Sequence, residues 1–291
     1  MPRWLAPARD ARRRIAQFID LLRPAAKVVW RDARGRCRQA AGSAIDLLFP
    51  PACALCERLL GDAASESDSD ENCVSSMQKA LLCDGCRRSF KYRSPRICPR
   101  CAAPLAPLSQ RRDCPECTKR KLPFAGSLAL GEYRGKLREA VLRTKKSAHE
   151  SLTMQLGAYL AQRTARETWA AKIDVVVPLP SHWWRRWTRG TSGPELLAYA
   201  VAEALNRPVV TRAVRCVRRT RKQGMLRPRE REQNVRGAFE VVRPEVIAKR
   251  GVLLVDDVMT TGATLREVAR CLRRAGAKRV YVAVLARGTG D

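Results

Sequence analysis

The sequence predicts an α/β fold: a parallel sheet flanked by helices, preceded by a small cysteine-rich module. Two observations lead to this prediction. Short apolar runs alternate with amphipathic stretches in the second half of the chain, as in parallel strands joined by helices. Four Cys-x-x-Cys pairs lie between Cys53 and Cys117, ahead of that half. The chain of 291 residues is long enough for one sizeable core and one small module.

Basic residues outnumber acidic ones by 57 to 28, which gives a formal net charge of +29. Such a charge favours a polyanionic partner such as nucleic acid, an anionic membrane surface or a phosphorylated ligand. An Arg-rich proteome explains the charge equally well. No run approaches the roughly 18 apolar residues of a membrane span. Charges interrupt every apolar stretch of residues 1–40, so we expect no secretory signal there. We therefore expect a cytoplasmic protein, with residues 1–44 as a flexible basic extension.

The cysteine pairs have the spacing of metal ligands. They are Cys53/Cys56, Cys83/Cys86, Cys98/Cys101 and Cys114/Cys117. Four thiolates complete the tetrahedral shell of a structural Zn²⁺ ion. Disulfides would need an oxidising compartment, and iron–sulfur binding is a minor alternative. The sequence predicts a double zinc ribbon over residues 45–122 with an acidic insert at 61–72. It would hold one or two ions, the first two pairs sharing one ion and the last two another.

A larger domain is predicted over residues 123–291. Strands are expected at the start of 127–136 and over 173–180, 251–257 and 279–287. Helices are expected near 136–146, around 152–160, over 194–205 and over 264–277. In the first helix Leu137, Val141 and Leu142 are expected to share the buried face. The polar, basic segment 217–237 lacks a periodic apolar face and is expected to be a mobile loop.

Two carboxylates follow the apolar run from Val252 to Val255. Asp256 and Asp257 stand at the carboxyl end of a predicted parallel strand, where open α/β sheets bind ligands. Gly262 permits a tight turn beside the threonine hydroxyls, and the next helix directs its amino terminus to the same place. This pattern suits a sugar phosphate, with the diol on the acids and the phosphate on the loop. The alternative is a turn with N-capping threonines after a core strand. Neither a P-loop nor a Rossmann glycine pattern is present.

The run "VLLVDDVMTTGATL", residues 252–265, resembles the phosphoribosyl-diphosphate (PRPP) motif of type I phosphoribosyltransferases. The resemblance extends over residues 45–287. The Cys-x-x-Cys pairs and the segments "YRGKLREAVLRTKK", "VVPLPSHWWRRWTRG" and "RRTRKQGMLRPREREQNVRGAF" occur in the order of the ComF family. That family is linked to competence for natural transformation and is often labelled a phosphoribosyltransferase. The resemblance implies a type I phosphoribosyltransferase-like sheet behind the zinc ribbons.

The resemblance also implies roles for individual residues. Asp256 and Asp257 would be the catalytic pair that holds the ribose hydroxyls. The full PRPP-binding set in this segment would be Val255, Asp256, Asp257, Met259, Thr260, Thr261, Gly262, Ala263 and Thr264. A pyrophosphate-binding loop would begin with Pro178, Leu179 and Pro180. A flexible loop that closes over the site would contain Thr220, Gln223, Leu226, Arg231 and Asn234.

One departure from the family concerns the segment after Gly190. The chain has Thr191-Ser192-Gly193 where family members commonly have Phe-Asn-Gln, so a substrate contact does not carry over there. Displacing pyrophosphate from a ribose requires Mg²⁺ and basic groups around the leaving group. Three functions stay open: a Mg²⁺-dependent phosphoribosyltransferase with an unidentified acceptor, a single-stranded-DNA-binding protein of competence, and a PRPP-binding regulator without catalysis. Their partners would be PRPP, single-stranded DNA and competence proteins.

Overall fold

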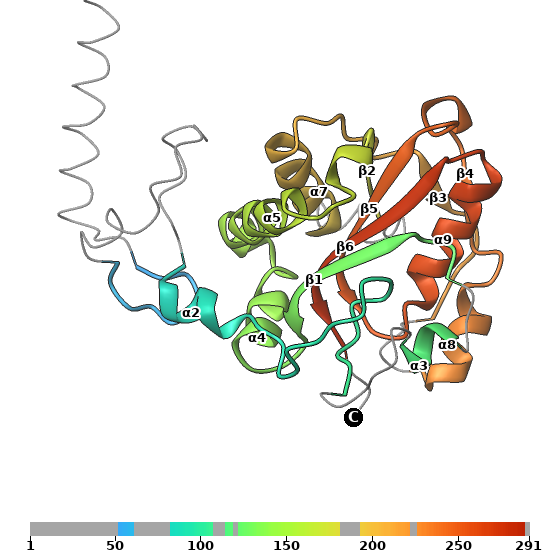
Figure 1. The fold of residues 1–291 in the computed structure, drawn as a ribbon. Helices are drawn as coiled ribbons and strands as arrows, with labels where there is room; N and C mark the ends of the chain where they lie inside the picture. The colour runs from blue at the N-terminus through green and yellow to red at the C-terminus, as the bar shows by residue number, and fades with distance from the viewer. Residues whose placement is uncertain are drawn as a thin grey trace, which may run out of the picture. The chain divides into compact units, whose positions relative to one another are not determined.

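A four-stranded parallel sheet lies at the centre of the second half of the chain (Figure 1). The computed structural model describes residues 52–60, 82–106, 114–118, 122–180, 193–221 and 226–288. In spatial order the strands are β1 (Gly126–Glu132), β6 (Arg279–Arg287), β5 (Gly251–Met259) and β2 (Val175–Pro178). All three pairings are parallel, as the sequence predicts.

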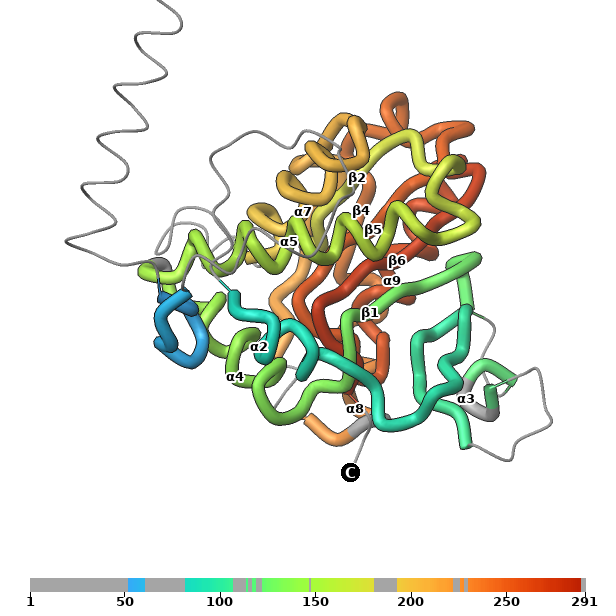
Figure 2. Tube along the Cα trace, turned by 60° about the vertical axis from the view of Figure 1, so that its left-hand side comes forward, coloured from blue at the N-terminus to red at the C-terminus, as the bar shows by residue number. Residues whose placement is uncertain are grey.

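Helices connect these strands and cover both faces of the sheet. The α-helices of this region are α4 (Gly135–Arg143), α5 (Glu150–Ala165), α7 (Gly193–Ala204), α8 (Pro228–Val235) and α9 (Ala263–Arg274). Short 3-10 helices occur at η2 (Ser147–His149), η3 (Ala170–Lys172) and η5 (Pro244–Val246). Helices α5 and α7 pack side by side (Figures 1 and 2). Gly157 allows this approach, because a Cβ atom there would lie 2.6 Å from the Cβ of Ala200.

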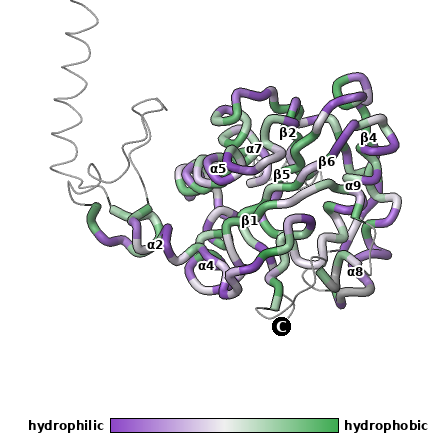
Figure 3. The backbone as a smooth tube through the Cα atoms, in the orientation of Figure 1, coloured by the Kyte–Doolittle hydropathy of each residue, from purple (hydrophilic) through white to green (hydrophobic). Residues whose placement is uncertain are grey.

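The central strand β5 is buried on both faces. Its alternate side chains enter two separate cores, since successive residues of a strand point to opposite faces. Leu253 and Val255 join the core formed with α5 and α7, whereas Val252 and Leu254 join the core formed with α9. The strands of the sheet carry mostly hydrophobic residues (Figure 3). This continuous apolar run is typical of a parallel strand covered by helices on both sides.

Helix α4 corrects one prediction about its buried face. Leu137 and Val141 are buried as expected, together with Ala140. Leu142 is 40% exposed, so it does not belong to that face. At 100° per residue, position 142 is rotated about 140° from position 137, whereas position 141 returns to within about 40° of it.

The segment 217–237, which the sequence predicts to be a mobile loop, contains helix α8, and this helix was not predicted. Pro228 occupies the first turn, and the Glu230 side chain accepts a hydrogen bond from the Arg227 backbone N–H at 2.7 Å. Charged contacts dock the helix on α9, including Arg266 to Glu232 at 3.1 Å. The segment connects two short strands, β3 (Val214–Cys216) and β4 (Phe239–Val241), which pair in antiparallel orientation. These two strands were not predicted either.

The cysteine-rich part contributes two short helices, α2 (Asp84–Ser89) and α3 (Pro115–Thr118). The described residues from Ala52 onward form one compact unit that includes this part and the parallel sheet. The extension 1–44 and the insert 61–72 lie outside the described residues, and the domain bounds 45–122 and 123–291 stay predictions. Among the residues that the structure describes, no helix is long and apolar enough to cross a membrane.

Candidate functional site

The predicted acidic pair lies near the carboxyl end of β5. Asp256 is 8% exposed, and the Asp257 side chain is 24% exposed. The Asp257 backbone N–H donates to Oδ1 of Asp256 at 2.8 Å. Lys145, just beyond α4, places its Nζ atom 3.5 Å from Oδ2 of Asp257. One carboxyl group is therefore enclosed by the fold, and the other is partly open beside a cation.

These surroundings change the protonation of the buried acid. Burial raises the pKa of Asp256 well above its usual value, and the neighbouring Asp257 carboxylate raises it further. The Lys145 charge acts in the opposite direction but does not prevail. A carboxyl group taken out of water needs a hydrogen-bonding partner. The pair can therefore bind hydroxyl groups that replace water, as the two adjacent hydroxyls of a ribose would.

The loop after β5 has the backbone of an anion-binding turn. Gly262 adopts a left-handed conformation with φ 68° and caps the amino terminus of α9. The Thr261 hydroxyl accepts a hydrogen bond from the Ala263 N–H at 3.4 Å, and Thr264 lies in the first turn of the helix. The partial positive charge of this terminus favours a phosphate there. Val255 and Met259 are buried, so only their backbone groups can contribute to the site.

The predicted pyrophosphate segment begins beside the acidic strand. Pro178 pairs with Val255 in the sheet, and the Leu179 N–H donates to the Val255 carbonyl at 2.8 Å. Residues 178–180 therefore lie next to the strand that carries the acidic pair. The remainder of this segment, including His182, and the unusual residues Thr191 and Ser192 lie outside the described residues.

Part of the predicted closing loop contacts the site. Nη1 of Arg231 in α8 donates to the Thr260 hydroxyl at 3.1 Å, and its Nε donates to the Leu226 carbonyl at 2.9 Å. Asn234 donates to the Arg221 carbonyl at 3.0 Å and accepts from the Arg221 N–H at 2.9 Å. This exchange fixes the chain just after Thr220. Gln223 lies outside the described residues.

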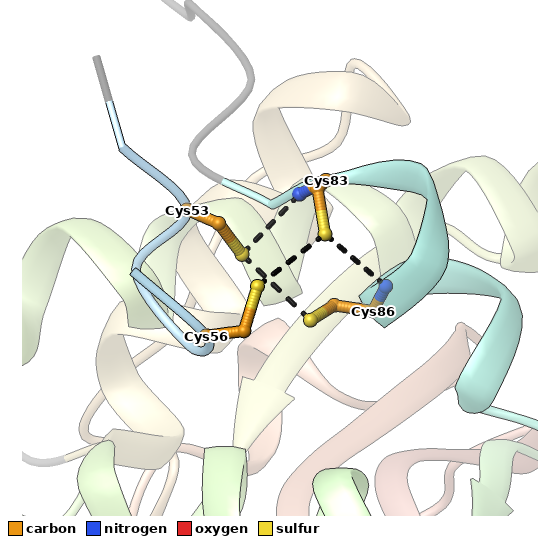
Figure 4. Close-up of side chains that lie close together, drawn as sticks. All are labelled: Cys53, Cys56, Cys83 and Cys86. Atoms are coloured by element: carbon orange, nitrogen blue, oxygen red, sulfur yellow. Dashed lines mark hydrogen bonds between the residues drawn. The ribbon is translucent and has the colours of Figure 1, made fainter. Parts of the chain in front are cut away.

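The eight paired cysteines form two clusters with the predicted sequential pairing. In the first cluster the sulfurs of Cys53 and Cys86 are 3.7 Å apart, and those of Cys56 and Cys83 are 3.6 Å apart (Figure 4). In the second cluster the sulfurs of Cys98 and Cys117 are 3.6 Å apart, and those of Cys101 and Cys114 are 3.7 Å apart. A tetrahedral ion with Zn–S bonds of about 2.3 Å separates its sulfurs by about 3.8 Å. Both clusters fit Zn²⁺.

One thiol in each cluster has a lowered pKa, which favours the thiolate form. Burial acts to raise the pKa of Cys53, but hydrogen bonds from backbone N–H groups, that of Cys83 first, lower it to about 6. The hydrogen bond with the Cys101 thiol is the main cause that lowers the pKa of Cys98 to about 5. Burial raises the pKa of the Cys86 thiol to about 12, although the ammonium of Lys136, in α4, donates to its sulfur at 3.6 Å. Cation and backbone donors stabilise thiolates, which are the form that binds metal.

Two buried charges near the site were not predicted. Glu132, at the end of β1, accepts from the Arg93 N–H at 2.7 Å and lies 2.8 Å from Nε of Arg134. Arg287, at the end of β6, is 8% exposed and contacts the loop that follows Met259. Both follow an apolar strand, as Asp256 does. That shared position is the signal by which the sequence could have indicated them.

Two family descriptions match this chain. Residues 191–291 match "Phosphoribosyl transferase domain", and residues 44–118 match "Double zinc ribbon domain". Competence protein F of Haemophilus influenzae is 32% identical over 210 residues, covering 71% of this chain and 90% of that protein. DNA utilization protein YhgH of Salmonella typhimurium is 30% identical over 209 residues, covering 71% and 90%.

A more distant relative has the same kind of name. Competence protein ComFC of Bacillus subtilis is 24% identical over 198 residues, covering 67% of this chain and 79% of that protein. The parallel sheet, the flanking helices and the two cysteine clusters agree with the two matched domains. The chain belongs to the ComF family, in which a double zinc ribbon is followed by a phosphoribosyltransferase-like domain.

Proposed function

We propose that this protein binds PRPP together with Mg²⁺ and transfers its phosphoribosyl group to an acceptor, with release of pyrophosphate. The observation that carries the proposal is the placement of Asp256 and Asp257 near the carboxyl end of β5, a few residues before the turn at Gly262 that begins α9. A pair of acids and an anion-binding turn on one short segment match the two ends of a ribose 5-phosphate.

Each part of the site has a task in this reaction. The acidic pair would hold the 2- and 3-hydroxyls, and the 260–264 turn would hold the 5-phosphate. The segment from Pro178 would face the pyrophosphate, and Arg231 reaches the Thr260 hydroxyl from the closing loop. The bond from the anomeric carbon to the pyrophosphate oxygen breaks with its electron pair leaving on oxygen. The acceptor forms the new bond to that carbon and loses a proton.

Magnesium fits the donors of this site, because it is usually bound by one or two carboxylates together with substrate phosphates. Asp256 and Asp257 are the carboxylates that would hold it with PRPP. Bound there, Mg²⁺ would neutralise negative charge on the departing pyrophosphate. The chain's own contribution is to orient the ribose, to supply cations such as Lys145 and Arg231, and to exclude water when the closing loop covers the site. We place this activity in the cytoplasm, where the cysteines stay reduced.

A second candidate is a single-stranded-DNA-binding role in competence, with or without PRPP as a regulator. The net charge of +29 favours it, and two of the relatives are named for competence and one for DNA utilization. Such a protein would bind single strands through its basic surface, with affinity that falls steeply as salt rises.

One assay separates these functions. The purified full chain is mixed with PRPP, Mg²⁺ and a panel of nucleobases and amines, with and without single-stranded DNA, and pyrophosphate release is measured. A transferase releases pyrophosphate with at least one acceptor, and Asp257→Ala abolishes that release. PRPP binding without turnover under any acceptor would contradict the transferase. Salt-dependent DNA binding that survives Asp257→Ala would support the second candidate.

A further inference from the structure

The end of strand β6 joins the second zinc cluster to the ribose-phosphate turn. Nε of Arg287 donates to the Cys101 carbonyl at 3.0 Å. Cys101 belongs to the zinc knuckle of residues 98–101, which supplies two of the cluster's ligands, Cys98 and Cys101. Nη1 of the same guanidinium donates to the Met259 carbonyl at 3.0 Å and also contacts the carbonyls of Thr260 and Gly288. The buried guanidinium of Arg287 therefore hydrogen-bonds to the backbone of the second zinc cluster and to the backbone of the ribose-phosphate turn.

These bonds determine where the turn directs its N–H groups. All peptide bonds of the described residues are trans, so each carbonyl points opposite to the N–H of the same peptide unit. Because the Met259 and Thr260 carbonyls are drawn towards the guanidinium, the N–H groups of Thr260 and Thr261 point away from it. The Met259 carbonyl also accepts from the Gly288 N–H at 2.9 Å. Loss of the cation therefore removes part of the support of these two peptide units and loosens the direction of their donors.

The knuckle is held against the sheet from a second side. The Ser127 N–H in β1 donates to the Pro99 carbonyl at 3.0 Å, and the Ser127 hydroxyl donates to the Arg100 carbonyl at 2.9 Å. A small pocket separates the cluster from the turn. Cys101 and Cys117 line it, together with Thr261, Gly262 and Arg287. The cluster, the arginine and the turn are therefore neighbours in one packed region.

We infer that Arg287 is a positioning residue, which couples metal binding by the second zinc cluster to the geometry of the ribose-phosphate turn. This inference rests on the proposed function. When Zn²⁺ fixes the knuckle, the Cys101 carbonyl holds the guanidinium, and the guanidinium holds the turn in its anion-binding shape. Arg287 acts through the backbone of residues 259–260, and PRPP binding and zinc retention at this cluster strengthen each other.

The test compares the full zinc-loaded chain with Arg287→Met and Arg287→Lys. Arg279→Met is the matched control, because Arg279 lies on the same strand but is exposed. Affinity for PRPP with Mg²⁺ is measured by calorimetry, and zinc content by elemental analysis. We expect Arg287→Met to bind PRPP about tenfold or more weakly while both ions remain. Arg287→Lys keeps the charge but not the forked set of donors. Its affinity for PRPP should lie between those of the original chain and Arg287→Met. The control should stay within about twofold of the original chain.

A second measurement begins with the original chain. Transfer of zinc to a chromogenic chelator is followed with and without PRPP and Mg²⁺, and PRPP should slow the release of one of the two ions. In Arg287→Lys this protection should shrink. If the original chain binds PRPP but Arg287→Met binds it equally well, or if PRPP leaves both release rates unchanged, the inference is overturned and the proposed function stands. If the original chain does not bind PRPP, both are overturned.

Discussion

Replacing Asp256 by Asn should weaken PRPP binding by about a hundredfold or more, while stabilising the ligand-free protein. The loss of affinity follows because Mg²⁺ and the ribose hydroxyls would stabilise the ionised form of Asp256 in the complex, and Asn cannot supply this charged acceptor. Each hydrogen bond to a charged group contributes about 1.5–3 kcal/mol. The gain in stability follows because burial and the adjacent Asp257 carboxylate already oppose ionisation of Asp256. Calorimetric titration gives the first effect, and thermal denaturation gives the second. We expect the gain in stability of the ligand-free protein to be about 1 kcal/mol, or roughly 2–4 °C in Tm.

The stability effect should depend on pH in a defined direction. The pKa of Asp256 is raised in the folded state from its ordinary value of 3.8. Well below that value the acid is protonated in both states, and its effect on stability is small. As pH rises towards the raised pKa, the unfolded state ionises first, and the folded protein loses stability relative to it. The advantage of Asn over Asp should therefore grow as the pH rises from about 4 towards the raised pKa of Asp256.

Asp174 provides a matched control for this substitution. Its carboxylate accepts a hydrogen bond from the Gly251 N–H at 2.7 Å, at the opposite end of β5 from the acidic pair. Asp174→Asn should leave PRPP affinity within about twofold of the original chain. If Asp256→Asn bound PRPP as tightly as this control, Asp256 would have no part in holding the ribose.

Removing zinc should have the largest effect on the structure. The purified chain should contain two ions, one in each cysteine cluster, and a strong chelator should unfold the cysteine-rich part. Few large apolar residues surround the second cluster, whose core consists mainly of the four cysteines with Ala103 and Leu105. Metal binding must therefore contribute most of the folding free energy there, and such sites contribute about 10–16 kcal/mol in small zinc modules. Protease cleavage within residues 82–106 after chelation would report the unfolding.

Cys271 allows a control for the zinc measurement. Its sulfur lies outside both clusters and donates to the Phe239 carbonyl at 3.3 Å. Cys271→Ser should retain both ions, whereas Cys98→Ser or Cys56→Ser should each lose one. A chain that contains no zinc and resists the protease after chelation would contradict the ribbon assignment.

The sequence predicts those parts of the fold that have a local pattern. The apolar runs of β5 and β6, the amphipathic face of α9 and the Cys-x-x-Cys spacing each lie within a few residues of sequence, and each was predicted correctly. Helix α8 was missed because capping and charged contacts with α9 hold it, including Arg266 to Glu232, and no apolar stripe is needed. The antiparallel pair of β3 and β4 was missed because each strand has only three residues.

The candidate site also contains residues that a local sequence pattern indicates and residues that it does not. Asp256, Asp257 and the turn at Gly262 form one continuous segment, so a sequence pattern could indicate them together. Arg287 could not be placed in that way, because its partner Cys101 is 186 positions away in the chain. Only the fold brings the end of β6 to the zinc cluster. The roles predicted for Pro178–Pro180 and for the closing loop remain predictions, although residues 178–180 begin beside Val255.

The most direct test is the titration of PRPP into the zinc-loaded full chain in the presence of Mg²⁺. The account predicts one molecule of PRPP bound per chain, with a Kd below about 1 mM, dependence on Mg²⁺, and loss of binding in Asp256→Asn. If the chain retains both zinc ions and is folded, yet binds no PRPP under these conditions, then the acidic pair and the turn after it are not a ribose-phosphate site.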